Sequence, residues 1–390
     1  MTTRPRVGYL TAASSLAIAS PGYFSSGIAA TGPVLIAAFS LSKSAFGFVL
    51  FAQGMVAALT SPLLGTLTDR VGGVRLLRWA FGLGVGVAVG LALSPGFAVF
   101  FVASMLAGLT ASAANPATNT LVNNHVPFHR RGKVIGMKQA GGPLGIAAAG
   151  ALTPPVAAAW GWRWAMLTTA CIPAIALVLL WMSRVSAGPI RPGRDRTVAR
   201  PPLGFRIWTL TVNALAIGWG TGALIGFIAV FGVEGVGLSE TTAGAMLTIM
   251  GLVGVVARLA WGAVADRTHH SDRLLAIMGA LAVVAAVGAW SAGRFGVWML
   301  AFSTVLVGAG AISWNSVAMF AVIKEASAER AGAASGVVVA GYMIGYSAGP
   351  WAFGALVDTT GGYGASLGMV VAAFAVSIAA LAIRPRGARG

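Results

Sequence analysis

Long apolar stretches alternate with short polar breaks along almost the whole chain. A hydrocarbon layer about 30 Å thick takes about 20 helical residues to cross. Twelve stretches reach that length, and they cover residues 8–39, 44–67, 74–93, 97–121, 132–156, 163–183, 206–232, 241–265, 273–292, 296–321, 332–356 and 363–383. The pattern therefore predicts an all-α membrane protein with twelve transmembrane helices in a lipid bilayer.

The composition agrees with this prediction. Of the 390 residues, 57% are hydrophobic and only 9% are charged, and the formal net charge is +17. Soluble domains carry about a quarter charged residues, so most of this surface is expected to face lipid. The basic residues stand in short gaps between apolar stretches, which argues against a nucleic-acid partner. The single cysteine, Cys171, excludes disulfides and cysteine-based metal sites.

The basic residues also indicate an orientation. With the N-terminus inside the cell, 21 of the 26 Lys and Arg residues fall in cytoplasmic segments, whereas the opposite side receives Lys43, Arg163 and Arg294. Cytoplasmic loops of membrane proteins are enriched in Lys and Arg, so we expect both termini in the cytoplasm. The expected location is a bacterial-type inner (plasma) membrane.

The chain is predicted to consist of two similar halves. Residues 184–205 contain four prolines and a cluster of arginines, so we expect a linker there, between a six-helix bundle at 1–183 and a second at 206–390. At an offset of 197, Gly54, Gly65, Asp69 and Arg70 align with Gly251, Gly262, Asp266 and Arg267. At an offset of 200, Gly108, Asn115, Gly132, Gly136, Gly141 and Gly145 align with Gly308, Asn315, Gly332, Gly336, Gly341 and Gly345. Such a duplication is typical of transporters that expose a central site to each side of the membrane in turn.

The loop after the second stretch carries a motif. It reads Gly65-Thr66-Leu67-Thr68-Asp69-Arg70-Val71-Gly72-Gly73-Val74-Arg75 and resembles the G-x-L-x-D-R-x-G-R/K-x-R signature of the major facilitator superfamily. It departs from that signature at Gly73, where a basic residue is usual, and a degenerate copy recurs at Gly262 to Arg267. Helix number, linker and repeat agree with the same superfamily, so the resemblance covers the whole chain. It implies two pseudo-symmetric six-helix bundles and is specific for fold rather than for substrate.

The motif has a physical interpretation as a gate. Asp69 can accept hydrogen bonds from helix N-termini or pair with a cation of an adjacent loop, and Gly65 allows helices to approach closely. Contacts made by Asp69 and Arg70, and by Asp266 and Arg267 in the second half, would close the cytoplasmic side in one state and break in the other. The alternative is that these residues are solvated loop charges.

Two cations, Lys138 and Arg258, lie inside predicted helices. A charge in a transmembrane helix costs at least about 2.5 to 3.5 kcal/mol, so each requires a compensating role. In the repeat Lys138 aligns with Val338 and Arg258 with Ser61, so each cation occurs in one half only, which favours a role in binding cargo. The alternatives are that Lys138 extends to the lipid headgroups and that Arg258 binds backbone carbonyls.

The acidic residues indicate the sign of the cargo. All nine lie in loops or at helix ends, at Asp69, Asp195, Glu234, Glu240, Asp266, Asp272, Glu325, Glu329 and Asp358. A cavity that holds two cations and no acid favours anions. We therefore predict transport of small organic anions, held by Arg258, which can bind a carboxylate bidentately, and by Lys138.

The run Ala257 to Arg267 resembles the A-R-x-x-x-G-x-x-A-D segment of monocarboxylate porters and oxalate/formate exchangers. This resemblance implies that Arg258 binds a substrate carboxylate, and it favours monocarboxylates. The chain lacks the acidic, aromatic first-helix signature of the porters and the eleventh-helix lysine of the exchangers. Its Lys138 to Pro143 run also resembles cyanate- and nitrate-type porters, which keeps inorganic anions open.

Weaker candidates and competing classes complete the prediction. Asn315 and Tyr342 lie within apolar stretches and are included among the predicted binding residues, although such residues also serve as contacts between helices. The sequence has no phosphate-binding loop and no metal-ligand spacing, so we expect no enzyme, cofactor or metal. Efflux of neutral or hydrophobic compounds and a non-transporting receptor on the same fold stay open, as does the oligomeric state.

Overall fold

The computed structural model describes residues 7–185, 203–268, 270–326 and 330–383. Every secondary-structure element in these residues is a helix, and each of the twelve predicted stretches falls on helix, which confirms the predicted fold class. The first half consists of α1 (Val7–Ala30), α2 (Gly32–Phe39), α3 (Lys43–Val71), α4 (Gly73–Ala92), α5 (Phe97–His125), α6 (Phe128–Gln139), α7 (Gly141–Trp160), α8 (Trp162–Thr168) and α9 (Cys171–Met182). The second half consists of α10 (Phe205–Glu234), α11 (Glu240–Thr268), α12 (Ser271–Phe295), α13 (Val297–Val307), the π-helix η1 (Gly308–Ile312), α14 (Asn315–Glu325), α15 (Ala331–Thr360) and α16 (Gly364–Ala382).

The helices have the length and apolarity that a membrane requires. Among the described residues ten segments meet both requirements, and eleven do if the bent pair α1 and α2 counts as one span. The stretch predicted at 332–356 lies within α15, whose 30 residues extend about 45 Å at 1.5 Å per residue. The angle between α1 and α2 is 61°. Pro33 stands at this bend, whereas α1 and α5 continue across Pro21 and Pro116.

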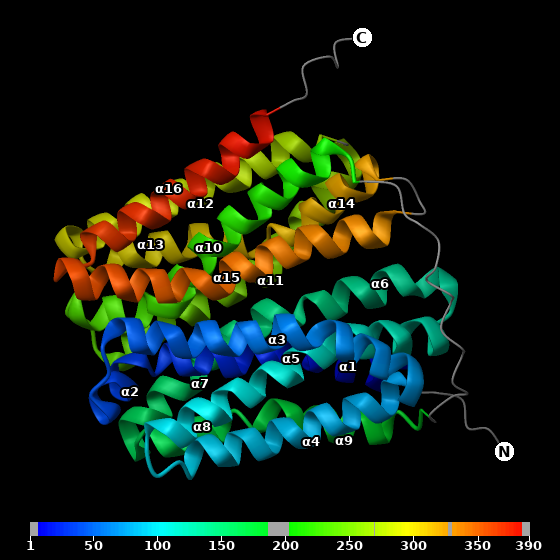
Figure 1. Cartoon of the computed structure of the whole chain (residues 1–390), viewed down its shortest axis with the longest axis horizontal. Helices are drawn as coiled ribbons and strands as arrows, with labels where there is room; N and C mark the ends of the chain where they lie inside the picture. The colour runs from blue at the N-terminus through cyan, green and yellow to red at the C-terminus, as the bar shows by residue number, and fades with distance from the viewer. Residues whose placement is uncertain (1–6, 186–202, 269, 327–329, 384–390) are drawn as a thin grey trace.

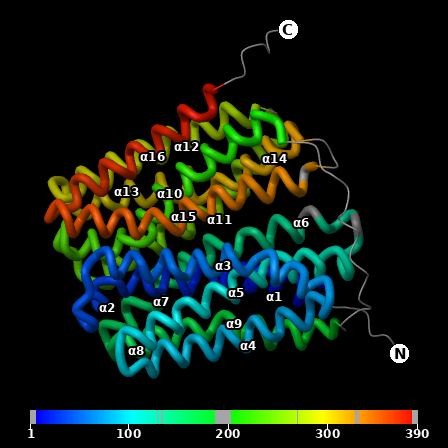
Figure 2. The backbone as a smooth tube through the Cα atoms, viewed as in Figure 1, coloured from blue at the N-terminus to red at the C-terminus, as the bar shows by residue number. Residues whose placement is uncertain are grey.

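The helices of the two halves form two groups that lie side by side (Figure 1). The backbone tube shows α3 of the first half running along α15 of the second (Figure 2), and the two helices are in contact. A second contact between the halves joins α7 and α11. The predicted linker falls mostly on 186–202, which lies outside the described residues.

The repeat is visible in the packing of matched glycines. A Cβ built on Gly108 would overlap the carbonyl of Gln53 and the side chain of Val56, and a Cβ on Gly308 would lie 2.5 Å from the Met250 carbonyl and 3.0 Å from Val253 Cβ. Gln53 and Val56 are the residues that an offset of 197 aligns with Met250 and Val253. The fourth and tenth spans therefore cross the second and eighth at equivalent points.

The two halves are tied together at one end of the bundle. Asp358, in the last turn of α15, accepts hydrogen bonds from the backbone N–H groups of Lys43 (3.0 Å) and Ser44 (2.7 Å) at the start of α3. The Lys43 ammonium pairs with Glu234 at the end of α10, and Glu234 also accepts a 2.7 Å hydrogen bond from the Tyr363 hydroxyl. We call these five residues the latch and this end of the molecule the latch end.

The opposite end carries the two copies of the motif, and we call it the motif end. Asp69 and Asp266 lie near the ends of α3 and α11, far from the latch along both helices. A Cβ built on Gly65 or on Gly262 would meet no atom within 4 Å, so the close approach predicted at Gly65 is not made in this conformation. The halves are thus joined at the latch end, whereas the motif glycines Gly65 and Gly262 make no close packing contact.

Candidate functional site

Arg258 joins the two halves in the interior. Its guanidinium donates from Nη1 to the carbonyl of Gln139 (2.5 Å) in the first half and from Nη2 to the carbonyl of Ile312 (3.0 Å) in the second. Its Nε is buried and has no hydrogen-bond partner among the described residues. The structure therefore places Arg258 between the halves, where it makes the carbonyl contacts that the sequence left as the alternative.

The two carbonyls are available because the helices are interrupted beside them. The helical partner of the Gln139 carbonyl would be the backbone nitrogen of Pro143, which carries no hydrogen. The partner of the Ile312 carbonyl would be Ser316, whose N–H instead bonds to Ser313 at 3.0 Å, just after η1. A proline and a π-helical turn thus leave two acceptors that one arginine satisfies.

Lys138 is buried within the first half. Only 1% of its surface is exposed, so it does not extend to the headgroups as the sequence alternative proposed. Its ammonium donates to Thr118 Oγ1 (3.1 Å) and Asn119 Oδ1 (2.5 Å), both on α5. Lys138 precedes Gln139, the residue that binds Arg258, but the side chains of the two cations use different partners.

Tyr342 lies beside Arg258 in the second half. The Tyr342 phenol is close enough to interact electrostatically with Arg258. Its ring stacks on Trp314, with a centroid distance of 5.1 Å and an angle of 7°. Asn315 follows Trp314 and has a buried side-chain oxygen with no hydrogen-bond partner among the described residues. Of the four predicted binding residues, Arg258 and Tyr342 are therefore brought together.

The four predicted gate residues are solvent-exposed at the motif end. The side chains of Asp69, Arg70, Asp266 and Arg267 make no hydrogen bond or ion pair with any other residue that the structure describes. This appearance fits both the predicted gate in its open state and the alternative of solvated loop charges. The contacts that close the molecule are instead those of the latch, which sequence reasoning missed.

The interior contains cations without acids. Every acidic residue that the structure describes stands within five residues of a helix end, and none belongs to the buried set. Within the same part of the chain no group of three His, Cys, Asp or Glu residues is placed to hold a metal ion. Arg258 and Lys138 are therefore balanced by neutral oxygens, from carbonyls, a hydroxyl and an amide.

The comparisons with known proteins identify the family. The family model of the Major Facilitator Superfamily matches residues 13–294. The structure is similar to that of a bacterial homolog of the human lysosomal transporter Spinster, inward-facing and occupied, with a TM-score of 0.75 and 16% identity over 97% of this chain and 96% of that one. It is also similar to a mutant of the nucleoside transporter NupG, with a TM-score of 0.75 and 12% identity over 96% and 98% of the two chains. No curated protein matches the sequence. Because its family model covers well over half of the residues, the chain belongs to the Major Facilitator Superfamily.

Proposed function

We propose that this transporter carries small organic anions, in particular monocarboxylates, by alternating access. The observation that supports this proposal is the interior placement of Arg258 and Lys138 with no buried acid among the described residues. A desolvated arginine attracts a carboxylate strongly and repels a cation. The superfamily membership supports a small-molecule cargo and a membrane environment. The proposed substrate class rests on the two interior cations.

The contacts of Arg258 suggest how the site exchanges partners. In this conformation its guanidinium holds one carbonyl from each half. A carboxylate with two oxygens can replace both carbonyls in bidentate geometry. Because the Gln139 bond crosses between the halves, replacing it would loosen their contact and so couple binding to the change of state. Lys138 would contribute positive potential from the first half.

The latch and the motif residues would serve as alternating gates. The latch is formed in this structure, whereas Asp69, Arg70, Asp266 and Arg267 are unpaired among the described residues. With the termini in the cytoplasm of a bacterial-type cell, as the distribution of Lys and Arg favours, this conformation opens toward the cytoplasm. Formation of the motif contacts and release of the latch would then open the outer side.

The test is transport by the purified full chain in liposomes. Labelled acetate, lactate and oxalate are offered beside cyanate, nitrate, a neutral hydrophobic compound and a hydrophobic cationic dye. We expect saturable uptake of the monocarboxylates, and at least a tenfold loss of uptake in Arg258→Ala and in Lys138→Ala, because each removes a charge-assisted contact. Arg78→Ala is the matched control, since Arg78 is an exposed cation at the start of α4.

Three results would contradict the proposal. Normal uptake in both interior variants would remove the binding role of the two cations. Competition by the cationic dye stronger than that of every carboxylate would reverse the sign of the site. Uptake of neutral compounds alone would favour the alternative of efflux, with Arg258 and Lys138 as structural residues.

A further inference from the structure

Three aromatic rings form a nearly parallel set beside Arg258. Trp314 and Tyr342 stack at 5.1 Å with an angle of 7°, and Tyr342 and Tyr346, one turn apart on α15, lie 5.9 Å apart with an angle of 22°. Trp314 is 1% exposed, whereas Tyr342 and Tyr346 are partly exposed. We call these three rings the aromatic platform.

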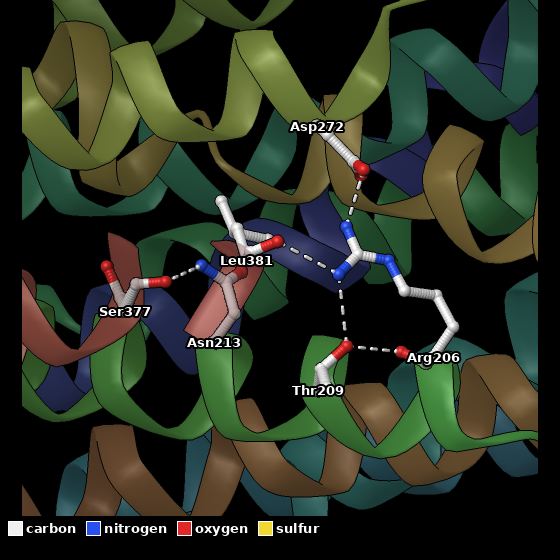
Figure 3. A network of polar contacts seen from close by, with 6 residues as sticks. All are labelled: Arg206, Thr209, Asn213, Asp272, Ser377 and Leu381. Atoms are coloured by element: carbon white, nitrogen blue, oxygen red, sulfur yellow. Dashed lines mark hydrogen bonds and ion pairs between the residues drawn. The ribbon is translucent and has the colours of Figure 1, made fainter. Parts of the chain in front are cut away.

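The Trp314 ring of the platform is fixed by two consecutive hydrogen bonds that run through Asn213. The indole N–H of Trp314 donates to Asn213 Oδ1 (2.8 Å), and Asn213 Nδ2 donates to the carbonyl of Ser377 on α16 (2.8 Å). Figure 3 shows Asn213 on the same helix as Arg206, which stands seven residues, about two turns, earlier on α10. Arg206 pairs with Asp272 on α12 (2.6 Å) and donates to the Leu381 carbonyl on α16 (3.1 Å).

The hydrogen bonds of Asn213 fix the Trp314 ring and do not involve Arg258 or Asn315. Asn213 is 1% exposed and uses its amide oxygen and nitrogen on Trp314 and Ser377. By contrast, Arg258 Nε and Asn315 Oδ1 are buried polar atoms that lack a partner among the described residues. Buried polar groups are normally hydrogen-bonded, so the unpaired Nε of Arg258, close to Tyr342, indicates a place where a ligand completes the bonding.

We infer that this site selects carboxylates that carry a flat aromatic ring, with the carboxylate on Arg258 and the ring against Tyr342 and Tyr346. The inference rests on the proposed function and narrows its substrate class. Offset parallel rings attract one another beyond the area they bury, so an aryl group gains a contact that a saturated ring of the same size does not. A bound cation is disfavoured here, although aromatic faces attract cations, because Arg258 already supplies positive charge.

The test compares two ligands of equal charge and similar size. Benzoate and cyclohexanecarboxylate compete against labelled acetate for the full-length protein in liposomes, and the ratio of their inhibition constants is the ring preference. We expect the wild-type protein to favour benzoate about three- to tenfold, the range that an aromatic pair contributes. Tyr342→Leu should bring the ratio close to one, and Tyr342→Phe should keep it.

The controls separate this inference from the proposed function. Trp79→Leu removes a ring that is 59% exposed on α4 and should leave the ring preference unchanged. If Tyr342→Leu does not fold, the ratio of the two inhibition constants on the wild-type protein still tests whether the site prefers an aromatic ring. Equal competition by both acids overturns the inference and leaves the proposed function standing. Failure of every carboxylate to compete overturns both.

Discussion

The two halves of the chain pack alike and differ in their interior chemistry. Gly108 and Gly308 meet equivalent residues of the neighbouring span, and Gly145 and Gly345 each approach the backbone of the first helix of their half. The interior side chains do not follow this symmetry. At an offset of 200, Trp314, Tyr342 and Tyr346 align with Ala114, Gly142 and Ile146. The aromatic platform therefore belongs to the second half alone.

The difference teaches which residues serve the scaffold and which serve the cargo. A duplicated fold needs the same close helix crossings twice, and small residues supply them in both halves. A cargo is not symmetric, so the groups that recognise it need to occur only once. Arg258 and the platform in the second half, and Lys138 in the first, meet this description.

The largest expected effect comes from breaking what the halves share. Gly108→Leu and Gly308→Leu should each abolish the folded protein, because even a Cβ would overlap the facing backbone and the longer side chain has no space. Monodisperse yield after detergent extraction, followed by size-exclusion chromatography, measures this. The control is Gly82→Leu, where a Cβ meets nothing within 4 Å. Loss in one half only would show that the two crossings are not equivalent.

The next effect comes from making the halves alike at the cations. Each of Arg258→Ser and Lys138→Val introduces the residue that stands at the aligned position of the other half, Ser61 and Val338 respectively. Each should lower the affinity for a carboxylate about ten- to a hundredfold, the range of a charge-assisted hydrogen bond. Competition binding on protein that elutes normally measures the loss.

A transfer of the cation sharpens the same comparison. The double variant Ser61→Arg with Arg258→Ser puts the arginine at the aligned position in the first half, where Ser61 is exposed. It should not restore binding, since neither the two free carbonyls nor the platform is present there. Recovery of wild-type affinity would mean that net positive charge suffices.

The two ends of the molecule should respond in opposite directions. Asp358→Ala removes the acceptor of two backbone N–H groups at the start of α3 and should favour the state that is open at the latch end. Under the proposed gating, Asp69→Asn removes a contact that forms in that other state, so it should favour the present one. We expect shifts of a few-fold in the population ratio, as for exposed polar contacts.

Distances between spin labels measure these shifts. Thr66→Cys and Thr268→Cys, in a Cys171→Ser background, place labels at exposed positions of α3 and α11 near the motif end. The short-distance population should rise with Asp358→Ala and fall with Asp69→Asn. A change in the same direction for both variants would contradict the assignment of two alternating gates.

Much of the fold could be predicted from the sequence because it depends on patterns that are local or periodic. Apolar length located the twelve helical stretches, and the repeat of glycines located equivalent crossings. Sequence could not decide whether a glycine marks close packing or open space. The structure has both, since Gly251 packs against Pro143 and Ala147 whereas Gly142 faces nothing within 4 Å.

The candidate site was predicted only in part, because its partners are backbone atoms and distant helix ends. Arg258 and Lys138 stood out as charges in apolar stretches, but the carbonyls that Arg258 binds carry no side-chain signal. Pro143, four residues after Gln139, was the one indication that a carbonyl would be free. The latch joins helix ends near residues 43, 234 and 358, and no local pattern connects them.

The smallest expected effect tests whether the second half holds its platform through Asn213. Trp314→Phe keeps a ring over Tyr342 but removes the N–H that binds Asn213 Oδ1. We expect the ring preference to fall about two- to threefold, within the net contribution of one hydrogen bond, while acetate uptake is unchanged. Trp219→Phe is the matched control, because the Trp219 indole N–H donates to the sulfur of Met369 at 3.4 Å and not to Asn213.

A double-mutant cycle separates positioning from general loss of stability. If Asn213 acts through Trp314, Asn213→Ala should lower the ring preference by a similar factor, and the double variant should lower it no further. A merely structural role would reduce the yield or the uptake of acetate and benzoate together and leave their ratio intact. Additive losses in the cycle would mean that the two residues act independently, and the platform would then owe its orientation to the stacking of Trp314 on Tyr342 alone.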